Sequence, residues 1–428
     1  MGGRSSQPAP GLVLSRPVLS WALYDFANTI FAFAVTSRYF SEWIVDDNQR
    51  GKPDWWFGAM SFAVAVALVL TLPPAGAIAD RYGRRKPFLV AFTLLSVAMT
   101  ALLGVVGSTL LALVVGGTAI FAFQSALIHY DPMLADIAPE ERRGRVSGLG
   151  AGLGYVGALV AAGILVLIVP ENDNQRAFLP TAAMFLLFAL PCFVFVRERA
   201  RHPVADRPAA VALAALGQLR ETMRHARRYR DIGRFLVARF LYYDAVATVI
   251  TFTVPYADRI GDLSSARTTA LLVLAINCAA VGAFGAGAAV ERVGPKRPLI
   301  AMLLLFCAAL VFTAAAGSVF SLWIAGPAIG LTLGTLAACD RIFMLRLTPP
   351  SLRGEFFGLF AITSKLSSGL GPLLIWGGTI WLLSDGLDVT GKTSASRIAI
   401  FLFAITSMAG ILTLRPLSDA QREWETET

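Results

Sequence analysis

The sequence has few charged residues. Asp, Glu, Lys and Arg make up 15% of its 428 residues, whereas 56% are hydrophobic and the mean hydropathy is +0.64. A soluble globular protein carries about 25% charged residues. This shortage of charge excludes an ordinary soluble domain and places the chain in a lipid bilayer.

Histidine and cysteine are also scarce. There are three histidines and four cysteines, and all four cysteines fall inside apolar runs. This pattern indicates neither a disulfide framework nor a zinc site. The segment from Gly386 to Thr393 matches the phosphate-loop pattern G-x4-G-K-[ST], but it lies in a short connection without the strand that this motif requires. We therefore expect no metal, no cofactor and no enzymatic activity.

Long apolar runs occupy nearly the whole chain. Each has about 20 residues, the length that a helix needs to cross a hydrocarbon core of about 30 Å. The expected spans are 18–42, 55–79, 87–107, 110–136, 146–170, 177–196, 235–257, 267–291, 298–316, 319–346, 355–383 and 396–414. The sequence thus predicts an all-α polytopic membrane protein with twelve transmembrane helices.

The net charge of +9 comes from 37 Lys and Arg against 28 Asp and Glu. Most basic residues lie in the two termini and the even-numbered connections, so the positive-inside rule predicts that both termini are cytosolic. The membrane spans divide these charges into short groups, and nucleic acid needs a contiguous basic face. We therefore expect no nucleic-acid partner.

Three patterns occur twice along the chain, at offsets of about 210–220 residues. Gly76–Pro87 is repeated in Gly287–Pro298, Pro139–Leu149 in Pro349–Leu359, and Tyr24-Asp25 with Thr29 in Tyr243-Asp244 with Thr248. The repeat unit is six helices, and an even number of crossings gives both copies the same orientation. The predicted organisation is a bundle over 1–196, a basic linker over 197–234 and a second bundle over 235–428. The linker is either an amphipathic helix on the membrane surface or a solvated connection.

The segment Gly76–Lys86 resembles the signature loop G-x-x-x-D-R-x-G-R-[RK] between the second and third helices of the major facilitator superfamily. More narrowly, Ser20–Asn28 and Gly144–Gly157 resemble the branch of the vacuolar amino-acid effluxer of autophagy and its bacterial relatives. The resemblance implies a secondary transporter of amino acids, working in export. It also implies a small-molecule substrate, protons as a candidate coupling ion, a monomer, and a place in the bacterial plasma (inner) membrane.

The signature loop can also be interpreted physically. Gly76 permits close helix approach, and Gly83 permits a turn that a side chain would strain. In the fold that the resemblance implies, Asp80 reaches the start of span eleven and Glu291 reaches the start of span five. These contacts either latch the cytosolic side in one state or the charges simply set the topology. The candidate gating residues are Gly76, Asp80, Arg81, Gly83, Arg84, Arg85, Glu291, Arg292 and Gly294.

Spans five and eleven are rich in glycine. Gly148, Gly150, Gly152, Gly154 and Gly157 lie in span five, with GxxxG spacing, and Gly369, Gly371, Pro372, Gly377 and Gly378 lie in span eleven. Such residues allow close backbone packing. Pro372 also offers a bend. These residues therefore serve either close helix packing or a bend used in gating.

Polar side chains within the spans are candidates for substrate binding or ion coupling, because an ionisable group in a membrane costs several kcal/mol unless it has a partner or faces water. The candidates are Asp25, Asn28, Gln124, His129, Asp131, Tyr243, Asp244, Asn277, Asp340, Arg341 and Lys365.

Several roles remain open for these candidates. Asp25 and Asn28 share one helix face, so Asp25 binds substrate or a proton, or hydrogen-bonds a neighbouring helix. Arg341 and Lys365 suit a substrate carboxylate, with Asp25 or Asp244 for its amine, while Arg341 equally suits neutralising Asp131. His129 is a pH-sensitive group or a satisfied hydrogen bonder.

The sequence therefore favours a transporter of a small polar solute that rocks two bundles about a midplane site. The alternatives are a proton-coupled exporter of drugs or metabolites, for which a more apolar cavity is expected, and a non-transporting membrane receptor or an intramembrane enzyme. Paired polar residues on corresponding helices of both halves favour transport.

Overall fold

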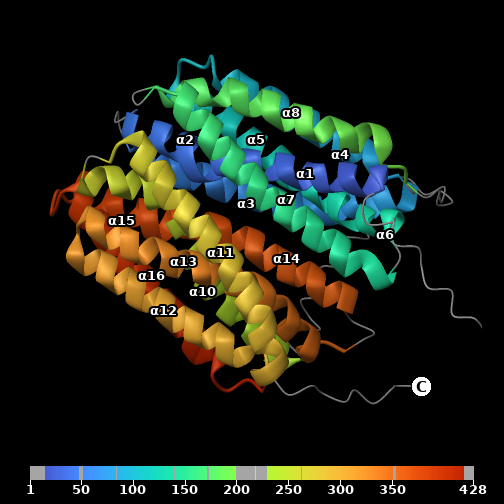
Figure 1. Ribbon diagram of the computed structural model, residues 1–428. Coiled ribbons are helices and arrows are strands. Elements are labelled where there is room, and N and C mark those ends of the chain that lie inside the picture. Colours follow the sequence, from blue (N-terminus) through green and yellow to red (C-terminus); the bar gives the residue numbers. More distant parts are fainter. Residues whose placement is uncertain are drawn as a thin grey trace, which may run out of the picture.

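The computed structural model describes residues 15–47, 52–82, 84–138, 140–170, 173–198, 217, 229–261, 263–349 and 353–418. All regular structure within these residues is helical (Figure 1). The elements are α1 (Arg16–Phe31), η2 (Ala32–Arg38), α2 (Tyr39–Glu42), η3 (Trp43–Asp47), α3 (Pro53–Tyr82), α4 (Lys86–Leu103), α5 (Thr109–Tyr130), η4 (Asp131–Met133), α6 (Leu134–Ile137), α7 (Glu140–Ile168), η5 (Asn174–Ala177), α8 (Phe178–Phe195), α10 (Arg230–Ile260), α11 (Ser265–Val293), α12 (Lys296–Ala316), α13 (Val319–Leu347), α14 (Arg353–Leu370), η7 (Gly371–Gly377), α15 (Gly378–Ile380), η8 (Trp381–Gly386) and α16 (Lys392–Leu414).

Twelve of these helices or helix runs are long and apolar enough to cross a membrane, which confirms the predicted architecture. We number them one to twelve in chain order. Span one runs from α1 to η3, span eleven runs from α14 to η8, and both contain π-helical segments. Because twelve is even, residues 15 and 418 lie on the same side of the molecule. We call this the terminal side and the opposite one the far side.

The two halves repeat the same helix packing. In the first half α1 packs against α7 and α8, and α4 packs against α5 and α8; in the second half α10 packs against α14 and α16, and α12 packs against α13 and α16. These pairs occupy corresponding places in the two copies. In Figure 1 the first half forms the blue and green bundle and the second half the yellow to red one. The duplicated sequence therefore builds two bundles of one design.

A lysine at the start of the third helix of each bundle hydrogen-bonds the end of the sixth helix. The ammonium of Lys86 donates to the carbonyl of Val196 at 2.6 Å, where span six ends. Lys296 donates in the same way to the carbonyl of Arg415 at 2.8 Å, where span twelve ends. A cation is favourable beside the orphan carbonyls of a helix C-terminus. The signature loop thus joins the third and sixth helices of each bundle.

Three glycines of span five allow close contact with span one. A Cβ added at Gly157 would lie 2.7 Å from Thr29 Oγ1, one at Gly154 would lie 3.1 Å from Thr29 Cγ2, and Gly150 lies against Asp25. The packing interpretation holds for these positions but is wrong for Gly152, which faces open space. The side chain of Gly148 lies outside the described residues.

Span eleven shows both packing and a helix distortion. A Cβ added at Gly369 would lie 2.7 Å from Ala65 Cβ of span two, and one at Gly58 of span two would lie 2.5 Å from the carbonyl oxygen of Pro372. The two halves therefore meet backbone to backbone along α3, α14 and η7. The α-helix gives way to the π-helical η7 at Gly371, directly before Pro372. Proline lacks the N–H that a regular helix needs there.

The phosphate-loop match has no phosphate-loop structure. Gly386 ends η8, and α16 begins at Lys392 inside the motif. A helical segment thus stands where the motif requires a strand.

Candidate functional site

Four polar side chains from the two halves meet near the terminal side. Lys365 on α14 donates to Gln124 on α5, with 2.6 Å between Nζ and Oε1. Asp131 in η4 interacts electrostatically with Lys365 and with Arg341 on α13. Asp131 and Arg341 are exposed, and the other two are half-buried. We call Gln124, Asp131, Arg341 and Lys365 the polar cluster. The first half contributes an acid and an amide, and the second half contributes two cations.

Asp131 has this position because of the residue that follows it. Pro132 has no N–H, so α5 ends at Tyr130 and the chain continues as a 3-10 turn. The turn leaves the carboxyl of Asp131 at the end of span four.

Asp25 on α1 lies beside the cluster. It interacts with Asp131, with the hydroxyl of Tyr130 and with the amide of Asn28. The hydroxyl of Tyr130 donates to the carbonyl of Trp21 at 2.8 Å, and the two rings stack with centroids 4.7 Å apart. Sequence reasoning missed Trp21 and Tyr130, although Tyr130 adjoins two predicted residues and Trp21 lies one helical turn before Asp25. They fix the end of span four against span one and so position Asp25 and Asp131.

Asn28 is 5% exposed, and neither amide atom makes a hydrogen bond of good geometry within the described part of the structure. A buried amide without such bonds costs about 1–3 kcal/mol. Asn28 lies one helical turn beyond Asp25, as the sequence predicts.

The acids of the second half have different surroundings. The carboxyl of Asp244 accepts a hydrogen bond from the backbone N–H of Gly371 at 2.7 Å, at the start of η7. Asp340 accepts from Arg239 at 3.0 Å and from the hydroxyl of Tyr242 at 2.6 Å, and both its side chain and that of Arg239 are buried. These contacts give both acids protein partners within their own half.

Arg239 is a functional candidate that sequence reasoning missed. Its guanidinium also donates to Ser364 Oγ at 2.6 Å and lies over the ring of Phe360 at 3.7 Å and over that of Tyr243 at 4.6 Å. The signal was available, because an arginine inside an expected span needs a partner.

Two other candidates point away from the cluster. His129 is buried, with its ring against Phe88 at 5.2 Å and Phe92 at 6.0 Å on α4. Asn277 is exposed and donates to the carbonyl of Val273 in its own helix at 2.8 Å.

The signature loop is described in part. Gly83 lies outside the described residues, and so do the side chains of Asp80, Arg81 and Glu291. The side chains at the starts of α7 and α14, near Gly144, Gly354 and Glu355, are not described either, so the latch stays a prediction. The close-packing interpretation of Gly76 is wrong for the described residues, because a Cβ there would meet none of their atoms within 4 Å.

Other residues of the loop and its copy are visible. Arg84 and Arg292 are exposed, and the backbone N–H groups of Arg85 and Lys86 donate to Glu198, which caps α4. Gly294, the counterpart of Gly83, has φ 78°, the left-handed turn for which glycine is suited.

A second polar contact joins the halves on the far side. Arg259 at the end of α10 donates from Nη2 to both carboxylate oxygens of Asp54 on α3, at 2.8 Å each. The indole of Trp376 in η7 donates to the same carboxylate at 2.8 Å, and Arg259 donates to Ser396 Oγ at 2.8 Å. We call Asp54, Arg259 and Trp376 the far-side lock. Sequence reasoning missed it because the expected span two began at residue 55.

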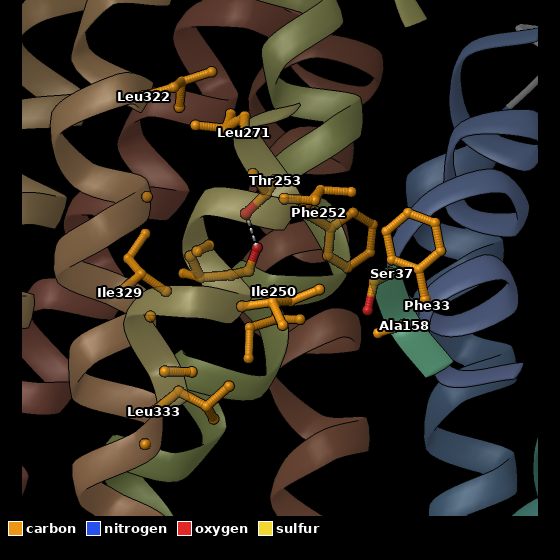
Figure 2. Close-up of a pocket in the computed structure, with 18 of the residues that line it drawn as sticks. Phe33, Ser37, Ala158, Ile250, Phe252, Thr253, Leu271, Leu322, Ile329 and Leu333 are labelled. Carbon is orange, nitrogen blue, oxygen red and sulfur yellow. Dashed lines mark hydrogen bonds between the residues drawn. The ribbon is translucent and has the colours of Figure 1, made fainter. Parts of the chain in front are cut away.

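A cavity of about 440 Å³ lies between the halves in their far portion. Figure 2 shows Phe33 and Ser37 of η2 on one side of it, and Ile250 and Phe252 of α10 and Ile329 of α13 on the other. Its described lining includes none of the eleven predicted binding residues. The polar cluster and the cavity are therefore separate features.

Comparison with known proteins agrees with this architecture. Residues 57–423 match the family described as vacuole effluxer Atg22 like. The chain is 29% identical to the uncharacterized MFS-type transporter YxiO of Bacillus subtilis, over 92% of this chain and 93% of that protein. It is 27% identical to autophagy-related protein 22 of Eremothecium gossypii, over 76% of this chain and 65% of the fungal protein.

Solved structures share the fold. A crystal structure of a mutant of the nucleoside transporter NupG matches with a TM-score of 0.73 at 12% identity, over 94% of this chain and 99% of that one. An inward-facing, unoccupied bacterial homolog of the human lysosomal transporter Spinster matches with a TM-score of 0.67 at 18% identity, over 96% and 98%. The chain belongs to the Atg22-like vacuole effluxer family and is an integral, multi-pass membrane transporter of the major facilitator type.

Proposed function

We propose that the protein exports amino acids by alternating access and holds their charged groups in the polar cluster. The observation that carries this proposal is the placement of opposite charges on opposite halves, with Asp131 on the first and Arg341 and Lys365 on the second. A zwitterion bound there bridges the two bundles. Its carboxylate pairs with the cations, and its ammonium pairs with Asp131 and Asp25.

The contacts within the polar cluster fit this role. Lys365 donates to the neutral amide of Gln124, and Arg341 offsets the charge of Asp131. A substrate carboxylate replaces the Gln124 amide with a charged acceptor, which makes a hydrogen bond roughly twice as strong. Without substrate, Arg341 thus offsets the charge of Asp131, and with substrate the two cations hold its carboxylate.

We also propose a membrane orientation, a proton-carrying residue and an oligomeric state for the transporter. The distribution of basic loops supports an orientation with both termini in the cytosol, and we propose the bacterial plasma membrane as the location. Asp25, beside the cluster and half-buried, is the acid best placed to carry a coupling proton. We propose a monomer as the working unit, with bundles at 1–196 and 235–428 joined by the basic linker.

Flux of radiolabelled amino acids into liposomes containing the purified protein, with and without a pH gradient, tests the proposal. Lys365→Met is expected to raise KM about 10- to 100-fold, from about 1.5–3 kcal/mol for a hydrogen bond to a charged group. Asn277→Ala, on the exposed face of α11, is the matched control and should leave flux unchanged. Absence of flux for every amino acid would refute the function. Normal flux in Lys365→Met would refute the site alone.

A further inference from the structure

The cavity between the halves has an apolar surface. Its walls come mainly from η2 and α7 of the first half and from α10, α11 and α13 of the second, with further residues from α1, α12, η7 and α16. They consist mainly of Ala, Val, Leu, Ile and Phe side chains. Its volume of about 440 Å³ falls in the range of small-molecule pockets, about 300–1,000 Å³. No charged residue among those that the structure describes lines it. A charged ligand there would lose its hydration without gaining a partner.

Three of the six hydroxyl groups at the cavity wall donate hydrogen bonds to backbone carbonyls. Thr29 donates to the carbonyl of Gly154 at 2.5 Å, and Thr253 donates to that of Val249 at 2.6 Å, the bond drawn in Figure 2. Tyr256 donates to the carbonyl of Thr313 at 3.3 Å.

Thr313 combines burial with the lack of such a bond. It lines the cavity from α12, is 4% exposed, and its Oγ1 makes no hydrogen bond within the described part of the structure. Threonines in these helices commonly donate to the carbonyl four residues earlier, as Thr253 does. A buried hydroxyl without a partner is unfavourable by about 1–3 kcal/mol. A ligand atom that bonds this hydroxyl removes that cost.

We infer that this cavity is a binding site for an uncharged, apolar small molecule that carries one hydroxyl or carbonyl group, which bonds Thr313 Oγ1. The site shares no residue with the polar cluster, so its ligand differs in chemistry from an amino-acid head group.

The ligand favours one state of the transporter. Trp376 lines the cavity and also donates to Asp54 in the far-side lock, and its ring stacks on Phe252 at 4.7 Å. Walls from both halves separate when the far side opens. A ligand that binds only the closed arrangement stabilises that arrangement. The molecule therefore acts as an inhibitor that holds the far side closed.

Binding of 1-naphthol to the detergent-solubilised full chain, measured by titration calorimetry, tests the inference. Naphthalene is the probe without a hydroxyl, and 1-naphthoate is the charged one. The wild type should bind 1-naphthol saturably and 1-naphthoate at least tenfold more weakly. Thr313→Val should weaken 1-naphthol binding about threefold to tenfold, the effect of one hydrogen bond, and leave naphthalene binding unchanged. Thr251→Val, outside the cavity, is the matched control.

Substitutions that fill the cavity with a large side chain provide a second, independent test. Ile329→Trp and Ala158→Phe fill it from opposite halves, and each should abolish saturable binding. Leu412→Trp adds an indole at an exposed position (58%) and should not. Arg259→Ala should weaken 1-naphthol binding in proportion to the loss of closed-state population, because the ligand binds only that state.

Several outcomes would overturn the inference. Binding that survives both filling variants, or that never saturates, would show partition into the micelle. Equal affinity for 1-naphthoate would contradict an apolar site. A phospholipid found by native mass spectrometry on the wild type and absent from Ile329→Trp would assign the cavity to a lipid chain instead. Unchanged binding in Arg259→Ala would refute the link to the closed far side.

Discussion

The far-side lock makes a sharp prediction about the balance between the two states of the transporter. Asp54 is 2% exposed, and Arg259 holds both of its carboxylate oxygens from the opposite half. Arg259→Ala leaves this carboxylate with the indole of Trp376 as a remaining donor. Removing one partner of a buried ion pair costs about 3–5 kcal/mol, because the other charge stays buried.

This cost falls on one state only. The two residues belong to different halves, so opening the far side separates them and exposes both to water. The variant therefore destabilises the closed state relative to the open one. Even if relaxation and water entry leave about 1.4 kcal/mol of the cost, the equilibrium shifts tenfold.

Cysteine labelling measures the shift. Ser37→Cys, introduced after replacement of the four native cysteines by serine, places a thiol at the cavity wall between the halves. A membrane-impermeant maleimide applied from the far side should label it at least tenfold faster in Arg259→Ala. The double variant Asp54→Asn with Arg259→Gln removes both charges and should label more slowly than Arg259→Ala, since no ion is left buried alone.

The chain provides a matched control on the same side. Arg176 pairs with Asp173 at 2.6 Å, but the side chains are 68% and 38% exposed. Such a pair contributes about 0–1 kcal/mol, so Arg176→Ala should leave labelling unchanged. An unchanged labelling rate in Arg259→Ala that remains monodisperse would refute the reasoning, since the pair would then not distinguish the two states.

Two further predictions follow from buried contacts elsewhere. Arg239→Met should lower the free energy of unfolding in detergent by about 3–5 kcal/mol, measured by denaturant titration, because Asp340 would stay buried without its cation; the double variant Arg239→Met with Asp340→Asn leaves no charge buried alone and should cost less. Gly58→Leu should speed labelling in the far-side assay, since its side chain would overlap Pro372 at a cost of about 1–3 kcal/mol; an unchanged rate would show that the halves do not need this close contact.

Helix positions were predictable from the sequence, because the length of an apolar run reports the thickness that it must cross. The expected span 298–316 corresponds to α12 at Lys296–Ala316, and 267–291 corresponds to α11 at Ser265–Val293. Their packing was predictable in outline as well. A duplicated pattern implies that the pairs formed in one half recur in the other, and they do.

The rotation of each helix was not predictable. Spacing along the chain places Asp340 and Arg341 next to each other, but it does not say which neighbour each meets. In the fold they diverge: Asp340 bonds Arg239, 101 residues away, and Arg341 faces Asp131. His129 shows the same limit, since its ring packs between Phe88 and Phe92 of another helix.

The ends of spans are a second limit. Asp54 lies at the first turn of α3, one residue outside the expected span. A charge at that position is typical of a loop residue in a hydropathy pattern. Only the docking of the second half buries it, and that contact depends on residues more than 200 positions away.

The two halves share a scaffold but differ in what their matching acids do. Asp25 and Asp244 occupy corresponding positions, each against a glycine of the fifth helix in its own half. In the second half this glycine is Gly371, which precedes Pro372 at the start of the π-helical η7. The carboxyl of Asp244 accepts a hydrogen bond from the backbone N–H of Gly371. The repeat that pairs Pro139–Leu149 with Pro349–Leu359 places Ala162 of span five at the position of Pro372. Asp25 instead lies against Gly150 and interacts with Tyr130 and Asp131 beside the polar cluster. The two matching acids thus contact their fifth helices at different levels: Asp244 bonds the backbone N–H of Gly371, whereas Asp25 lies against Gly150 beside the proposed site.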